Sequence, residues 1–177
     1  MEIRSFEARY LKKAQDVLHS AFCHPQSDPQ YNEWTFAERL LQDGGYRENL
    51  CLIALEDGKV TGYLALSEAK IGEHPGLALG PLGVRPEYQN RGIGKQLVQE
   101  SIRRAREEDA GWIVLLGGDY YRRFGFEPAK PYGIFLPESE EASGHLWILF
   151  LKQSAKGETQ GALRYCGAFY TPQGALL

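Results

Sequence analysis

A strand–helix–strand unit between residues 76 and 117 constrains the fold most strongly. "GLALGPLGV" indicates a strand, and residues 92–108 place Ile93, Leu97 and Val98 on one helical face. "GWIVLLGG" is a continuous apolar run, which is typical of a strand buried on both faces. Because a helix joins the two strands, they are expected to pair in parallel through a right-handed crossover.

The remaining segments predict antiparallel strands and two N-terminal helices. "MEIRSF" indicates a first strand, and apolar residues at helical spacing predict helices within 7–22 and 34–41. The Asp57-Gly58 pair between two β-rich runs predicts a tight hairpin. A helical turn at "DYYRRF" and strands at 145–151 and "ALRYCGAFY" follow. We therefore expect an α/β fold with a mixed, mostly antiparallel sheet, one splayed parallel pair, and helices on both faces.

Composition limits the function classes. The 177 residues are enough for one substantial core, so we expect one domain over 1–177. The net charge of -3 disfavours nucleic-acid binding, and no apolar stretch approaches the ~20 residues of a membrane span. Three scattered cysteines indicate reduced thiols and no metal site, and the adjacent Cys23-His24 pair is not expected to be catalytic. We expect a cytoplasmic protein.

Between the two parallel strands lies "GPLGVRPEYQNRGIGKQL", residues 80–97, which combines glycines and prolines. Pro81 cannot donate a ladder hydrogen bond, and Gly80 and Gly83 beside it predict a bulge. A bulge would splay this strand from its parallel neighbour, leaving backbone N–H and C=O groups along a cleft. An amide-bearing ligand or water would satisfy those groups.

Farther along the same stretch, "QNRGIG" meets the start of the helix. The first N–H groups of a helix have no internal partners, and its dipole makes that end positive. Gly92 and Gly94 leave room for an anion such as pyrophosphate, and Arg85, Arg91 and Lys95 add positive charge. Neither the GxGxxG nor the GxxxxGK[ST] pattern occurs here.

The segment "VRPEYQNRGIG" resembles the acetyl-CoA motif of the GCN5-related N-acetyltransferase (GNAT) superfamily. The core of that motif is Q/R-x-x-G-x-G/A, and Gln89, Gly92 and Gly94 match it. Together with "YYRRFGFEPA", the stretch is most like the YhbS-like branch of predicted acetyltransferases. The match spans residues 50–130, and the element order agrees over nearly the whole chain. The resemblance implies a GNAT fold, an acetyl-CoA donor and a small-molecule or peptide amine acceptor.

The resemblance also assigns a cofactor site. Backbone amides from Arg91 to Lys95 are expected to hold the pyrophosphate, and pantetheine is expected to bond to the strand near Leu82 and Val84 like an added strand. The full expected set is Leu82, Gly83, Val84, Gln89, Asn90, Arg91, Gly92, Ile93, Gly94, Lys95 and Tyr121.

Two catalytic roles follow from the chemistry of acetyl transfer. A backbone N–H on the bulged strand, near Leu82 or Gly83, could polarise the thioester carbonyl. Tyr121 lies four residues before Gly125, where the family places its general acid, so it is the candidate proton donor. Tyr120 is expected to serve packing.

The general base and the acceptor stay open. The bulged strand lacks the glutamate that many relatives carry there. Glu68, Glu73, His74 and His24 are the alternatives, acting either directly or through a water. Acceptor contacts could come from His24, Tyr31, Trp34 and Phe36, or those aromatic residues could belong to the core. Two alternatives to acetyl transfer are a non-catalytic acetyl-CoA sensor and the transfer of a longer acyl group. The protein could also form a homodimer.

Overall fold

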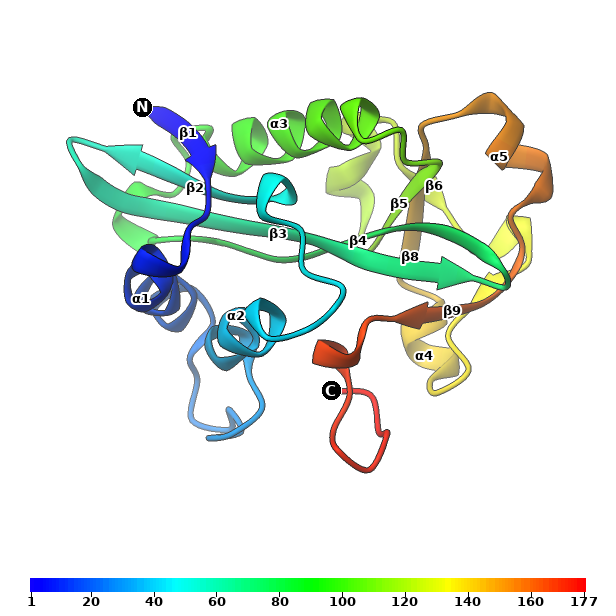
Figure 1. Cartoon of the computed structure of the whole chain (residues 1–177), viewed down its shortest axis with the longest axis horizontal. Coiled ribbons are helices and arrows are strands. Elements are labelled where there is room, and N and C mark those ends of the chain that lie inside the picture. The colour runs from blue at the N-terminus through cyan, green and yellow to red at the C-terminus, as the bar shows by residue number, and fades with distance from the viewer.

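A long strand, β3, organises the sheet in the computed structural model, which describes residues 1–177 (Figure 1). It pairs antiparallel with β2 along its first half, with β9 near its end, and with β4 along its other edge. The strands are β1 (Glu2–Ser5), β2 (Cys51–Glu56), β3 (Lys59–Ile71), β4 (His74–Val84), β5 (Trp112–Leu116), β6 (Glu127–Pro128), β7 (Ile134–Phe135), β8 (Leu146–Phe150) and β9 (Gly161–Tyr165). The spatial order is β1-β2-β3-β4-β5-β8-β6, with β9 joining β3 to β7.

Helices cover both faces of this sheet. The helices are α1 (Leu11–Phe22), α2 (Glu33–Leu41), α3 (Ile93–Glu107), α4 (Glu140–Ser143) and α5 (Gln153–Glu158). Figure 1 shows α3 on one side of the long strands and α1 with α2 on the other. Each side has its own buried cluster: Leu97 and Val98 of α3 belong to one, while Val17 and Leu18 of α1 belong to the other. The predicted fold class is confirmed.

Local sequence accounts for the element boundaries. Asp57 and Gly58 adopt φ angles of 49° and 76°, which close the predicted β2–β3 hairpin. Asn32 begins α2 with a capping box: its side chain accepts from the Thr35 N–H at 2.8 Å, and the Thr35 hydroxyl accepts from the Asn32 N–H. The hairpin turn sets the end of β2 and the start of β3, and the capping box sets the start of α2.

Several short elements were not predicted. They are β6, β7, α4 and α5, and β7 pairs in parallel with β9 over two residues. The turn at "DYYRRF" is a 3-10 helix, Asp119–Phe124. Every helix is too short or too polar to span a lipid bilayer.

Candidate active site

The predicted break between the parallel strands is present. β4 and β5 pair only at Leu77–Ile113 and Ala78–Val114, and β5 continues alongside β8 instead. In β4 the register against β3 slips between Leu79 and Leu82, so Gly80 and Pro81 form a bulge. The prediction of a splayed cleft beginning near Pro81 is confirmed.

The β3–β4 register shows which backbone groups face that cleft. Arg85 donates its N–H to the Thr61 carbonyl oxygen at 2.9 Å, which marks this as a hydrogen-bonded pair. Such pairs alternate along an antiparallel ladder, so Gly83 bonds to β3, while Leu82 and Val84 point their N–H and C=O groups toward the β5 side. The Val84 carbonyl accepts from the Gln89 side-chain amide at 3.0 Å. Of Leu82 and Gly83, only Leu82 thus has its N–H on the side of the cleft.

The N-terminus of α3 carries a run of free donors. Gly92 is the residue before the helix, its φ of 81° is left-handed, and no side chain caps the end. The first helical hydrogen bond comes from the Gln96 N–H, and the backbone N–H groups from Asn90 to Lys95 donate to no other atom of the chain. A Cβ built on Gly94 would meet only the Val84 side chain, at 3.8 Å. The space over these donors is open.

The three basic residues near this loop differ in their partners. Lys95 is exposed and outside every ion pair, whereas Arg91 lies 4.0 Å from Glu56 and over the Tyr88 ring. Arg85 donates its Nε–H to the Val60 carbonyl at 2.9 Å. Arg85 is thus bound to β3, and Lys95 is the freest of the three cations.

A cavity of about 570 Å³ opens beside the bulge. Its walls come from β4, the end of β5, the 3-10 helix, the segment 22–39 and the C-terminal region. Its lining includes Leu79, Gly80, Pro81 and Leu82 of the bulge, Leu115 and Leu116 of β5, and Tyr121. The cavity therefore adjoins the cleft-facing N–H of Leu82.

Tyr121, which follows the end of β5 in the 3-10 helix, lines this cavity. Its ring packs over Gly117, where a built Cβ would come within 2.8 Å of it, and against Phe126, with centroids 6.0 Å apart. Burial raises the pKa of its phenol, with a smaller contribution from Tyr120. The hydroxyl is in none of the side-chain hydrogen bonds, whereas Tyr120 is 45% exposed and outside the cavity lining.

Three of the four residues that the sequence suggested for acceptor contacts line the cavity. His24, Tyr31 and Phe36 line the cavity, but Trp34 does not: its ring packs against His19 with centroids 4.8 Å apart. Three charged residues that the sequence analysis did not single out, Asp28, Glu33 and Arg39, also line it. Their spacing in the sequence gives no signal, because the cavity forms only where the loop 23–32 and α2 meet β4, β5 and C-terminal residues in the fold.

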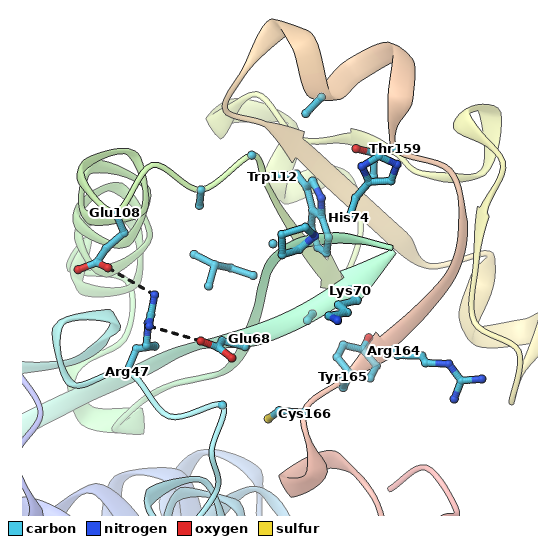
Figure 2. Close-up of a pocket in the computed structure, with 18 of the residues that line it drawn as sticks. Arg47, Glu68, Lys70, His74, Glu108, Trp112, Thr159, Arg164, Tyr165 and Cys166 are labelled. Carbon is cyan, nitrogen blue, oxygen red and sulfur yellow. Dashed lines mark ion pairs between the residues drawn. The ribbon is translucent and has the colours of Figure 1, made fainter. Parts of the chain in front are cut away.

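Two of the alternative bases lie in a different cavity, shown in Figure 2. This cavity, of about 780 Å³, surrounds the starts of β4 and β5 and the end of α3. Glu68 lies 3.4 Å from Arg47, which also pairs with Glu108 at 3.6 Å. His74 lines the same cavity, and the exposed Glu73 lines neither cavity. Of the four alternatives, His24 alone shares the cavity of Tyr121.

Two of the three cysteines have thiols whose pKa is raised by burial. Burial raises the pKa of the Cys51 thiol to about 12 and that of Cys166 to about 11, so both stay protonated near neutral pH. Cys23 is exposed, and the Nδ1 atom of its neighbour His24 lies 3.2 Å from the Gln26 backbone nitrogen and 3.3 Å from the Gln26 Oε1.

Residues 13–126, which include the bulge, the α3 N-terminus and Tyr121, match the model of the acetyltransferase (GNAT) family. The chain belongs to the GNAT acetyltransferase family. It is 36% identical over 110 residues to the uncharacterized N-acetyltransferase YjhQ of Escherichia coli K12, covering 58% of this chain and 61% of that protein. It is 37% identical over 98 residues to the uncharacterized N-acetyltransferase YhbS of the same organism, covering 53% and 58%. The similarity therefore spans about three-fifths of these relatives.

Two solved structures share this GNAT fold over nearly the whole chain. A GNAT acetyltransferase from Brucella melitensis, crystallised with acetyl-CoA, is 29% identical with a TM-score of 0.76, covering 95% of this chain and 97% of that one. YhbS from Escherichia coli, crystallised with CoA, has a TM-score of 0.85 at 24% identity, covering 99% and 95%. The predicted resemblance to YhbS-like GNAT proteins is confirmed.

Proposed function

We propose that this GNAT protein transfers the acetyl group of acetyl-CoA to a primary amine. The observation that carries the proposal is the continuity of three features: free amides at the α3 N-terminus, the splayed β4–β5 cleft, and a cavity containing Tyr121. This continuity provides an anion site, a backbone edge for an amide-bearing arm, and a place for the acceptor.

The residues of the chain fit such a donor. The N–H groups from Asn90 to Lys95 bind the pyrophosphate, with Gly94 leaving the space open and Lys95 adding charge. Leu82 and Val84 offer outward backbone groups to the pantetheine amides. Gln89 helps to position this edge, since its side chain already bonds to the Val84 carbonyl. Bound acetyl-CoA supplies the activated acetyl group.

Two groups of the chain then act at the reacting thioester. The Leu82 N–H donates to the thioester carbonyl oxygen and stabilises the negative charge that develops there. The Tyr121 hydroxyl would donate the proton that the departing thiolate requires, since a phenol is protonated near neutral pH and burial raises its pKa further. Holding the amine beside the thioester supplies much of the rate acceleration, since correct orientation of two reactants can lower the activation barrier by roughly 7–11 kcal/mol.

His24 is the base candidate that the cavity favours. It lines the cavity and is exposed, and with its Nδ1–H donating to the Gln26 Oε1 at 3.3 Å its Nε2 is free to take the proton of the amine through a water. An amine with a low pKa is neutral before it attacks, so solvent water alone could take the proton that it loses as the amide forms.

An amine-acceptor screen with acetyl-CoA and free-thiol detection tests the proposal. Thiol release that depends on both the amine and the protein supports acetyl transfer. Tight binding of acetyl-CoA with no thiol release across a broad panel would instead favour the non-catalytic sensor, the alternative that the missing strand glutamate leaves open.

A further inference from the structure

Arg39 of α2 is held with its guanidinium against the cavity of Tyr121. Its Nη1 donates to the Thr35 hydroxyl at 2.7 Å, and its Nε donates to the Ala168 carbonyl at 3.3 Å. The Cζ atom lies 5.5 Å from the centroid of the Tyr31 ring and 5.7 Å from that of Phe36. Two hydrogen bonds and two rings therefore restrict the orientation of this side chain.

No carboxylate of the chain lies within 4.0 Å of this guanidinium. Arg39 is half-buried, and burial lowers the pKa of its guanidinium, although arginine stays charged at any physiological pH. Asp28 and Glu33 line the same cavity, yet neither lies within ion-pair distance of Arg39. The Asp28 carboxylate accepts the N–H groups of Gln30 and Tyr31 instead, both at 2.8 Å.

A positioned cation without a counter-charge is suited to an anionic ligand. A partly desolvated charge is costly without a partner, and the remaining N–H groups of the guanidinium form a planar fork that matches a carboxylate. The rest of the cavity is rich in apolar surface, with Phe22, Leu79, Leu116 and Phe169 among its lining residues. The cavity thus combines an anion contact with an apolar wall.

We propose that the acceptor is a primary amine that also carries a carboxylate on an apolar body, and that Arg39 binds this carboxylate. The inference rests on the proposed acetyl transfer, and it adds the chemical class of the acceptor. Arg39 acts as a specificity residue, because the carboxylate it binds is remote from the amine that reacts.

A matched pair of acceptors tests the inference: para-(aminomethyl)benzoate and para-(aminomethyl)benzamide. Both have the same aromatic body and a benzylic amine, and they differ in the charge of the remote group. A charge-assisted hydrogen bond predicts that kcat/KM favours the carboxylate by roughly tenfold to a hundredfold, mostly through a lower KM.

Variants separate recognition from a structural role. Arg39→Gln should bring the ratio of kcat/KM for the two acceptors close to one, and Arg39→Lys should restore part of the preference. Arg164→Gln is the control, since Arg164 is an exposed arginine that lines the other cavity and forms no ion pair (Figure 2). This control should keep the wild-type ratio.

The outcomes distinguish the two proposals. Equal kcat/KM for both acceptors in the wild-type protein overturns the carboxylate inference while acetyl transfer stands. An unchanged preference in a folded Arg39→Gln protein overturns the assignment to Arg39. Absence of thiol release with every amine, including benzylamine, overturns acetyl transfer and this inference together.

Discussion

At the residue scale, Tyr121 carries the most specific chemical assignment. Tyr121→Phe removes the proton donor and keeps the ring that packs on Gly117 and Phe126. We expect kcat to fall about 10²–10⁴-fold with little change in acetyl-CoA affinity. Steady-state kinetics with an amine acceptor, together with calorimetry for the cofactor, measures both quantities.

The pH dependence of this variant has a defined direction. Burial raises the pKa of Tyr121, so the wild-type protein has the phenol protonated at neutral pH and loses that proton donor as the pH rises through the raised pKa. Tyr121→Phe should lack this basic limb. Tyr120→Phe is the matched control, and equal loss of kcat in both variants would remove Tyr121 from the mechanism.

Gly94 tests the anion site at the same scale. Gly94→Glu places bulk and negative charge beside the free N–H groups, while its Cβ fits without displacing Val84. Calorimetry should show weaker acetyl-CoA binding in a protein that remains folded. Gly157→Glu adds the same charge on α5, where a Cβ meets no atom within 4 Å, and should bind like the wild type. Unchanged affinity in Gly94→Glu would refute the location of the pyrophosphate.

At the scale of elements, the start of β4 depends on one glycine. A Cβ built on Gly76 would lie 2.3 Å from the buried Trp112 ring of β5. Gly76→Ala must therefore displace the indole or the strand, and we expect a loss of about 1–3 kcal/mol in the free energy of unfolding. Denaturant titration measures this loss, with Gly157→Ala as a control that should be neutral or slightly stabilising. A Gly76→Ala midpoint equal to that of the wild type would show that the ring is free to move.

Elements with strong local signals were predictable from the sequence. The Asp57-Gly58 hairpin, the α3 start at Gly92 and the break at Pro81 each depend on residues adjacent in the chain. The two-residue strands β6 and β7 were missed because their pairing partners, β8 and β9, are distant and their own sequence is too short for a period.

The same distinction applies to the candidate site. The open N–H groups at Leu82 and in the loop 89–95 could be predicted because bulge and helix-start signals are local. Arg39 could not, because its position depends on the Ala168 carbonyl, 129 residues away, and on a cavity that several elements form. The sequence likewise proposed Glu68 and His74 as bases, yet the fold places them in a cavity apart from Tyr121.

At the scale of the whole molecule, three buried clusters share one sheet. Strand β3 contributes Leu64 to the α3 side, Ala65 to the α1–α2 side and Ile71 to the cluster around β8. Because one strand connects all three clusters, we expect residues 1–177 to unfold in a single cooperative transition. Coincident denaturation curves from circular dichroism and tryptophan fluorescence would support this, and two separated midpoints would contradict it.

Hydrogen–deuterium exchange of the whole protein, with and without acetyl-CoA, tests the central claim most directly. In the free protein the N–H groups of residues 90–95 have no internal acceptor, and the Leu82 N–H faces the cleft, so these amides should exchange quickly. Bound acetyl-CoA should slow exchange in peptides covering 82–84 and 90–95. It should leave unchanged the peptides around Glu68 and His74 in the other cavity. Binding that protects neither of the first two segments, or protects only the cavity of Figure 2, would contradict the account.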